Sequence, residues 1–160
     1  MGDCCFFSHF FCLALSKVLT WRIRSCHKLG GNMPKGLEKH VDLTQQVIAA
    51  CYEVHKVLGP GLEERFYRDA LAYELQLRGL ECHREQEFKV EYKGKTLGTH
   101  RVDLIVEDKV LVELKAVTGA LLAVHVAQTI SERRVSKLPV ALLVNFGEAS
   151  VQIRRLESRD

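Results

Sequence analysis

The chain has 160 residues, of which 47% are hydrophobic and 27% are charged, as in an ordinary soluble globular domain. Its formal net charge is only +3, so the charge permits binding to a polyanion without requiring it. The sequence has no internal repeat, no low-complexity segment, no nucleotide-binding glycine loop and no serine–histidine–acid order. These features exclude repeat proteins and several common enzyme classes.

The first 32 residues differ from the rest. Their apolar run at 4–15 is short for a membrane span, which needs about 20 residues, and its charges follow the run, unlike those of a secretory signal. We interpret residues 1–32 as a disordered extension or upstream sequence before Met33, and residues 33–160 as the domain. A weakly anchored or acylated tail is the alternative. We expect no stable membrane insertion and an intracellular protein, cytoplasmic or nuclear.

Four of the six cysteines lie in the first 26 residues, and only Cys51 and Cys82 fall in the expected domain. No cysteine pair has zinc-ligand spacing. We therefore predict that Cys51 and Cys82 are free thiols that fill the core in a reducing compartment.

After a breaker cluster at 30–34, apolar spacing predicts two helices. The first begins at a cap, Asp42 or Thr44, and ends at Leu58 before Gly59-Pro60-Gly61. The second covers about 63–78. Its predicted core face comprises Phe66, Ala70, Tyr73 and Leu77.

Strands are predicted next. Segments 82–92 and 96–106 form a hairpin across a turn at 93–95, and a third strand covers 110–117. A helix over about 121–135 precedes two more strands, 138–145 and 151–156. This order predicts a mixed α/β or α+β domain with a central sheet, and the helical crossover favours a partly parallel sheet.

Acidic residues interrupt two of these apolar strands. Asp103 lies in one, and Glu113 and Lys115 lie in the next. Because side chains alternate along a strand, a turn centred on Asp108 would place Asp103 opposite Glu113, on the face that also carries Lys115. A buried carboxylate is costly unless it is paired or binds a cation. The pattern therefore indicates either a magnesium site beside a lysine or a structural ion-pair cluster.

A motif at the start of the second helix adds to this pattern. The chain contains Gly61-x-x-Glu64-x-x-Tyr67, followed in order by Arg101-x-Asp103 and Glu113-x-Lys115. This combination resembles the GxxExxY protein family, a branch of the PD-(D/E)XK nuclease superfamily, over about residues 42–156. The resemblance implies a restriction-endonuclease-like core, in which helices flank a central mixed sheet.

The resemblance also implies roles for single residues. Asp103 and Glu113 would bind Mg²⁺ or Mn²⁺ together with Glu64, and Lys115 would be the catalytic lysine. Gln128, in the helix after the lysine strand, would lie near them.

Several of these residues also have simpler explanations. Glu64 is equally explained by the dipole at a helix start, and Tyr67 by packing, although its hydroxyl could bond a site carboxylate. Arg101 would neutralise Asp103, contact a phosphate or form a plain ion pair.

One position departs from the family. Similar sequences usually carry an aromatic residue four positions after the glutamine, but this chain has Glu132, followed by Arg133 and Arg134. The added charge predicts a helix that is frayed, shortened or differently packed. It would also fit a degenerate copy of the enzyme.

Our leading hypothesis is a Mg²⁺- or Mn²⁺-dependent nuclease that hydrolyses phosphodiester bonds, of DNA by family resemblance. The cation would lower the pKa of a water molecule, and Lys115 would orient that water or stabilise developing charge. The alternative is a catalytically inactive nuclease-fold module that binds nucleic acid or a protein partner. A hydrolase of another phosphate ester is a third hypothesis, and a homo-oligomer is compatible with all three.

Overall fold

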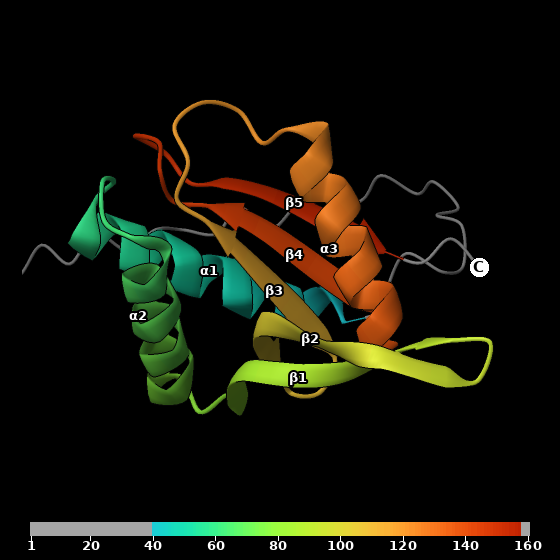
Figure 1. The fold of residues 1–160 in the computed structure, drawn as a ribbon. Helices are drawn as coiled ribbons and strands as arrows, with labels where there is room; N and C mark the ends of the chain where they lie inside the picture. Colours follow the sequence, from blue (N-terminus) through green and yellow to red (C-terminus); the bar gives the residue numbers. More distant parts are fainter. Residues whose placement is uncertain (1–39, 158–160) are drawn as a thin grey trace, which may run out of the picture. The chain divides into compact units, whose positions relative to one another are not determined.

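The computed structural model describes residues 40–157, so the predictions about residues 1–32 lie outside the described residues. The described chain folds into three helices and one five-stranded sheet (Figure 1). In chain order the elements are α1 (Val41–Leu58), α2 (Glu64–Leu77), β1 (Cys82–Tyr92), β2 (Lys95–Val106), β3 (Val110–Lys115), α3 (Ala123–Ser136), β4 (Val140–Asn145) and β5 (Gln152–Glu157).

The sheet is mixed. Its strands follow the order β1-β2-β3-β4-β5, and only β3 and β4 run parallel, joined by the α3 crossover. The parallel pair is the part of the sheet buried most completely, as expected for strands with structure on both faces. The predicted central sheet, its hairpin and its partly parallel character are therefore confirmed.

The turn between β2 and β3 fixes the register of the two strands. Val106 pairs with Val110 and Leu104 with Val112, so the turn is centred on Asp108 as predicted. The turn residues Glu107 and Asp108 both have positive φ, of 53° and 50°. The next position along this register would place Asp103 opposite Glu113.

Helices α1 and α2 cover one face of the sheet and enclose the main apolar core with β2, β3 and β4. Helix α3 lies over the other face, where a smaller cluster contains Val102, Ile105, Leu111 and Ala141. All three buried residues of α3 are polar: Thr129, Glu132 and Arg133. Polar groups therefore occupy part of the space between α3 and the sheet.

The predicted core face of α2 is wrong except at Ala70, which packs against the main core. Phe66, Tyr73 and Leu77 are 45–64% exposed, whereas Tyr67, Leu71 and Leu75 are fully buried. The helix has two adjacent apolar rows, and the row beginning at Tyr67 faces the core because Tyr67 stacks on Phe146, with ring centroids 4.8 Å apart.

Two smaller predictions about the helices also need correction. Helix α1 begins at Val41, so neither Asp42 nor Thr44 is its cap. The hydroxyl of Thr44 instead donates to the carbonyl of Val41. Helix α3 is neither frayed nor shortened at Glu132-Arg133-Arg134, because it continues to Ser136 and buries Glu132.

Both described cysteines are free thiols, as predicted. Cys51 lies in the core, and Cys82 is half-buried beside it. Burial raises the pKa of Cys51 to about 12 and that of Cys82 to about 11, so both stay protonated at neutral pH. None of the described helices has the length and hydrophobicity needed to cross a membrane.

Candidate active site

Asp103 lies at an irregular point of the β1–β2 ladder. Arg84 pairs with Leu104 and Gln86 with Val102, whereas the intervening Glu85 has a φ of +52° and is absent from the ladder. The carboxylate of Asp103 turns toward the end of β3, where Oδ2 accepts a hydrogen bond from the backbone N–H of Leu114 at 2.9 Å. The break in the ladder thus positions a largely buried carboxylate beside β3.

Glu113 and Lys115 extend from the same side of β3, as strand alternation requires. Nζ of Lys115 lies 2.6 Å from Oε1 of Glu113, and the two side chains are only 13% and 5% exposed. A charge-assisted bond of this length is among the stronger polar contacts in proteins. It holds the ammonium group at a fixed position in the site.

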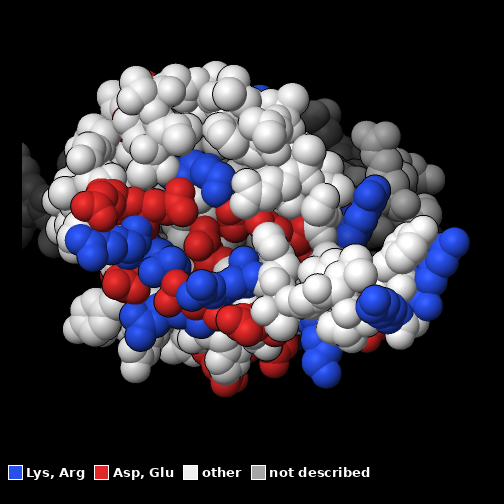
Figure 2. Space-filling model, in the orientation of Figure 1, with Lys and Arg blue, Asp and Glu red and all other residues white. Residues whose placement is uncertain are grey.

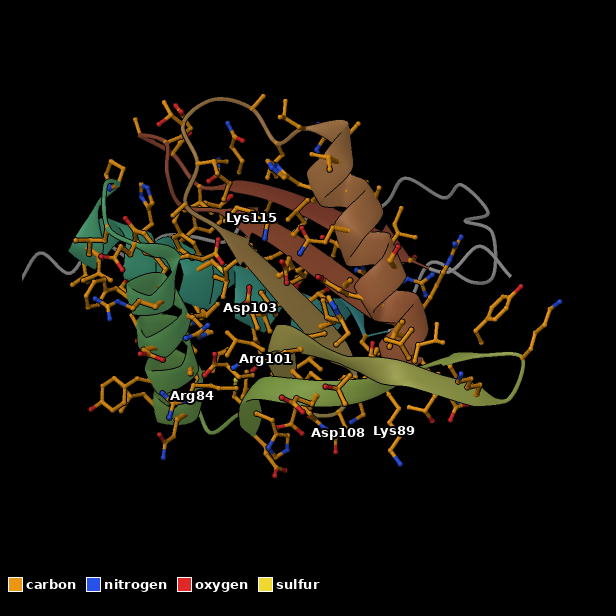
Figure 3. All side chains as sticks on the ribbon, viewed as in Figure 1. Arg84, Lys89, Arg101, Asp103, Asp108 and Lys115 are labelled. Carbon is orange, nitrogen blue, oxygen red and sulfur yellow. The ribbon has the colours of Figure 1, made fainter. Side chains whose placement is uncertain are left out.

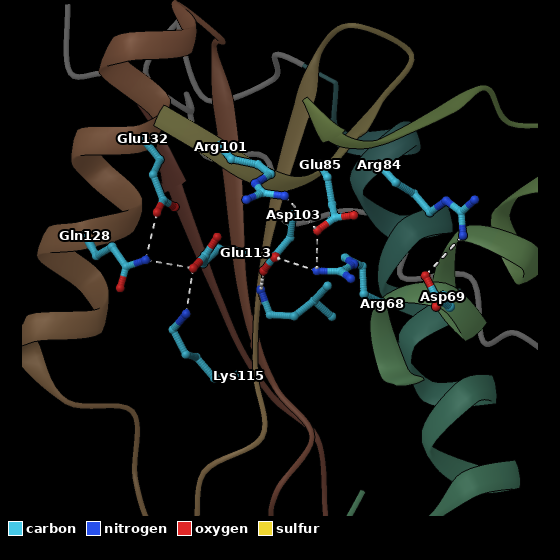
Figure 4. Close-up of polar contacts among 11 residues, drawn as sticks. Arg68, Asp69, Arg84, Glu85, Arg101, Asp103, Glu113, Lys115, Gln128 and Glu132 are labelled. Atoms are coloured by element: carbon cyan, nitrogen blue, oxygen red, sulfur yellow. Dashed lines mark hydrogen bonds and ion pairs between the residues drawn. The ribbon is translucent and has the colours of Figure 1, made fainter. Parts of the chain in front are cut away.

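Helix α3 brings two more polar side chains to Glu113. Nε2 of Gln128 donates to Oε1 of Glu113 at 2.9 Å and to Oε1 of Glu132 at 2.8 Å (Figure 4). The same oxygen of Glu132 lies 3.1 Å from Nε2 of His100 in β2. Glu132 is 2% exposed, and its Oε2 is buried without a partner among the described residues.

Helix α2 contributes Glu64 and Arg68 from the opposite side. Nη1 of Arg68 lies 3.7 Å from Oδ1 of Asp103 and 3.3 Å from Oε1 of Glu85. Burial raises the pKa of Glu64, and the charges of Asp103 and Glu132 raise it further, against the effects of Lys115 and Arg68. Glu64 therefore lies close enough to the other charged groups of the cluster for their charges to change its pKa. Sequence reasoning missed Arg68, although its position one helical turn after Glu64 was a usable signal.

Two predicted accessory residues contact other groups. Arg101 is 60% exposed and pairs with Glu85 at 3.5 Å. The hydroxyl of Tyr67 donates to the carbonyl of Gly59 at 2.7 Å and accepts from the N–H of Leu62 at 3.1 Å. Tyr67 therefore anchors the glycine-rich loop before α2 and makes no bond to a site carboxylate.

Asn145 is a buried residue that sequence reasoning missed. Its amide donates to the carbonyls of Val117 and Gly119, and its Oδ1 accepts from the N–H groups of Val117 and Gly147. The segment that follows Lys115 is thereby fixed to the end of β4. An apolar strand ending in asparagine was the only sequence signal for this role.

The electrostatics of the cluster fit a bound cation. Burial, and then the charge of Asp103, raise the pKa of Glu113 to about 9, against its hydrogen bond from Lys115. Burial disfavours the Lys115 ammonium, but its hydrogen bond to Glu113 and the nearby acids outweigh burial and raise its pKa. Crowded carboxylates of this kind gain from a hard divalent cation, which prefers oxygen ligands.

The described acidic side chains do not by themselves form a complete metal site. Among residues 40–157, no group of three or more His, Cys, Asp or Glu side chains is close enough to hold a metal ion as it stands. Arg68 and Lys115 occupy positions beside the acids and balance their charge. Figure 2 shows acidic side chains in the middle of this face with lysine and arginine side chains around them.

Residues 41–156 match the family model of the PD-(D/E)XK nuclease superfamily. The match confirms the predicted superfamily, and the five-stranded mixed sheet with flanking helices is consistent with the predicted restriction-endonuclease-like core. No curated protein matches the chain.

The solved structure of SSO0001 is similar to this chain, with a TM-score of 0.49 and 17% sequence identity. The similarity covers 78% of this chain and 62% of that one, so the chain spans less than two thirds of the length of SSO0001.

Proposed function

The chain belongs to the PD-(D/E)XK nuclease superfamily, and we propose that it is a metal-dependent nuclease that hydrolyses phosphodiester bonds in DNA. One observation carries the proposal. Asp103, Glu113 and Lys115 come together from two adjacent strands, largely buried, with the ammonium of Lys115 held 2.6 Å from Glu113. Membership of the superfamily supports a nuclease-like function, and the choice of DNA rests on resemblance alone.

Asp103 and Glu113 would hold Mg²⁺ or Mn²⁺, with Glu64 as a further ligand and the backbone carbonyl of Leu114 as a candidate ligand. Once bound, the cation would polarise the phosphate and lower the pKa of the attacking water. Gln128 keeps Glu113 in place from α3.

Lys115 has the central role among the protein's own groups. Its ammonium, positioned by Glu113, donates a hydrogen bond that orients the water or offsets the charge that develops on the phosphate oxygens. Hydrolysis forms a bond between the water oxygen and phosphorus and breaks one phosphorus–oxygen ester bond. The water gives up a proton to the surrounding solvent, and the departing oxygen takes one up from solvent.

A second function has one observation in its favour. Arg68 and Lys115 already neutralise the acids, and the described residues contain no ready-made metal cluster. A catalytically inactive module that binds nucleic acid or a protein would need no more than this arrangement. The two functions differ in whether a cation binds at Asp103.

The test is cleavage by the full chain of linear and circular DNA in Mg²⁺, Mn²⁺ or EDTA. We expect metal-dependent cleavage that is lost in Asp103→Asn and Lys115→Met. The matched controls are Asp108→Asn and Lys109→Met. These residues lie in the β2–β3 turn, where Asp108 is 78% exposed, and should leave cleavage unchanged.

Three outcomes would reject the nuclease. Equal cleavage by wild type and both site variants would mean a contaminating enzyme. If the folded protein binds Mn²⁺ but does not cleave DNA, the proposed metal site would stand and the proposed hydrolysis would be rejected. Absence of both cleavage and metal binding would favour the inactive module.

A further inference from the structure

The β1–β2 hairpin extends well beyond the rest of the sheet. Strand β3 pairs with β2 only at residues 104–106, so the distal half of the hairpin has β1 and β2 as its only strands. We name residues 89–99 the β1–β2 arm. Every residue of the arm except Val90 is exposed. Figure 1 shows the hairpin running past α3 to one side of the molecule.

The arm carries three lysines, Lys89, Lys93 and Lys95. Lys89, Lys93 and Lys95 make no ion pair with any described residue, and Lys93 only lies over the ring of Tyr92 at 5.4 Å. The single acid of the arm is Glu91. By contrast, Arg68, Arg84 and Arg101 are all paired with acids of the body. The arm is therefore a net positive extension beside an acidic site.

We propose that the β1–β2 arm binds the phosphate backbone of duplex DNA to one side of the active site. This inference rests on the proposed nuclease function. Lys89 pairs with Thr99, four residues before Asp103, and Lys95 lies eight residues before it. At about 3.3 Å per residue, these positions are roughly 13 and 26 Å along the strand from the site.

These distances define a footprint. B-DNA rises about 3.4 Å per base pair, so the arm lysines would contact phosphates about four to eight base pairs from the scissile bond. Arg101 lies between Asp103 and Lys89 in Figure 3, where its 60% exposed side chain pairs with Glu85. A backbone that enters at Lys115 and runs along the hairpin would therefore meet cations along its length.

The shape and tip of the arm also suit a groove. The major groove of B-DNA admits a two-stranded β-ribbon, and the distal arm is such a ribbon. Tyr92 and Leu97 near its tip are 60% and 63% exposed, so apolar surface is available for sugar carbons and base edges.

A second copy of the chain fits the β1–β2 arm less well as a binding partner than DNA does. Pairing through the edges of the arm is opposed by its lysines and by the register shift between Val90 and Glu91, two features that block edge-to-edge association of strands. The exposed apolar side chains of the arm, Tyr92 and Leu97, are also too few for the interface of a stable dimer. Charge complementarity therefore favours a polyanion.

The experiment measures binding of the full chain to a fluorescent 24-base-pair duplex in EDTA, where cleavage does not occur, at several salt concentrations. The arm variant combines Lys89→Ala, Lys93→Ala and Lys95→Ala. The control variant combines Lys56→Ala, Lys109→Ala and Arg154→Ala, which remove the same charge from α1, the β2–β3 turn and β5. Because all six side chains lie outside the core, circular dichroism should report folded proteins.

We expect the arm variant to bind at least tenfold more weakly at 0.1 M salt and to lower the slope of log K against log salt by about 2.7, close to 0.9 per lost phosphate contact. The control variant should change the affinity less than threefold.

Equal losses in the arm and control variants would overturn the proposal, as would an arm variant that binds like wild type. A wild type that forms dimers lost in the arm variant would assign the arm to a second copy instead. Cleavage distinguishes the two proposals. If DNA binding depends on the arm lysines but no cleavage occurs, only the proposed nuclease function is rejected. If cleavage occurs and does not depend on the arm lysines, only this inference is rejected.

Discussion

Nε2 of Gln128 lies 2.9 Å from Oε1 of Glu113, so helix α3 is bonded directly to an acid of the candidate site. The same nitrogen donates to Glu132 at 2.8 Å. Two buried carboxylates therefore share one amide group, and rotating that amide would point its oxygen at both of them. This arrangement fixes the amide orientation and makes Glu132 a positioning residue for Gln128.

The first prediction concerns Glu132. Glu132→Ala removes the acceptor of both Gln128 and His100, and we expect the free energy of unfolding to fall by about 1–3 kcal/mol because two hydrogen bonds to a buried carboxylate are lost, each worth about 0.5–1.5 kcal/mol. Glu132→Gln keeps an acceptor oxygen and should cost less. Urea unfolding provides the measurement, with Ser131→Ala on the exposed side of α3 as control.

An alanine variant as stable as wild type would contradict this prediction. It would mean that desolvation of the unpartnered Oε2 costs as much as the two hydrogen bonds contribute. A double-mutant cycle with His100→Ala then isolates the His100–Glu132 interaction, for which we expect about 0.5–3 kcal/mol.

The second prediction concerns Arg68, whose guanidinium lies 3.7 Å from Asp103. A positive charge at this position repels a cation bound to the same carboxylate. We therefore expect Arg68→Gln to bind Mn²⁺ about 5–10-fold more tightly in calorimetry at low salt. Arg84→Gln is the matched control, because Arg84 pairs with Asp69 at 3.1 Å outside the cluster.

Unchanged or weaker Mn²⁺ binding by Arg68→Gln would show that Arg68 orders Asp103 for the cation and does not compete with it. The salt dependence separates the two cases. Competition between charges weakens as salt is added, whereas loss of an ordering contact does not.

The third prediction concerns Tyr67. Tyr67→Phe removes bonds to Gly59 and Leu62 but keeps the ring on Phe146. We expect the free energy of unfolding to fall by about 1–2 kcal/mol and Mn²⁺ affinity to stay within twofold of wild type. Tyr73→Phe, at a position that is 63% exposed, is the control. A large loss of metal affinity without a loss of stability would instead give Tyr67 a direct role in the site.

The strand part of the site could be predicted from sequence because it depends on local rules. Asp103, Glu113 and Lys115 lie within thirteen consecutive residues, and a turn centred on Asp108 with strand alternation sets their relative positions. The same rules placed Cys82–Tyr92 and the β1–β2 hairpin correctly. Such predictions need no knowledge of how distant elements pack.

The helical part depends on packing between elements far apart in the chain. Helix α2 offers two apolar rows, and its spacing alone does not say whether Phe66 or Tyr67 faces the core. The burial of Glu132 required knowing that His100, 32 residues earlier, would lie opposite it. Charge next to an apolar stretch suggested fraying, but a partner on another strand satisfied that charge.

The final prediction follows from the raised pKa of Glu113. Burial, and then the charge of Asp103, move that pKa from 4.5 to about 9, so the folded protein holds this proton more tightly than the unfolded chain. The resulting stability is fully present below pH 4.5 and is lost as pH rises toward 9. Lys115 adds nothing in this window, because its raised pKa starts from 10.5.

We therefore expect metal-free wild type to lose stability between pH 6 and 9 relative to Glu113→Gln, by at most about 1.4 kcal/mol per pH unit. Urea unfolding of both proteins in EDTA measures the difference, which cancels the titration of other groups. A difference independent of pH would mean that Glu113 is already ionised at pH 6 and is held so by Lys115. In that case Mn²⁺ should bind without releasing a proton, whereas a proton held by Glu113 must leave when the cation binds.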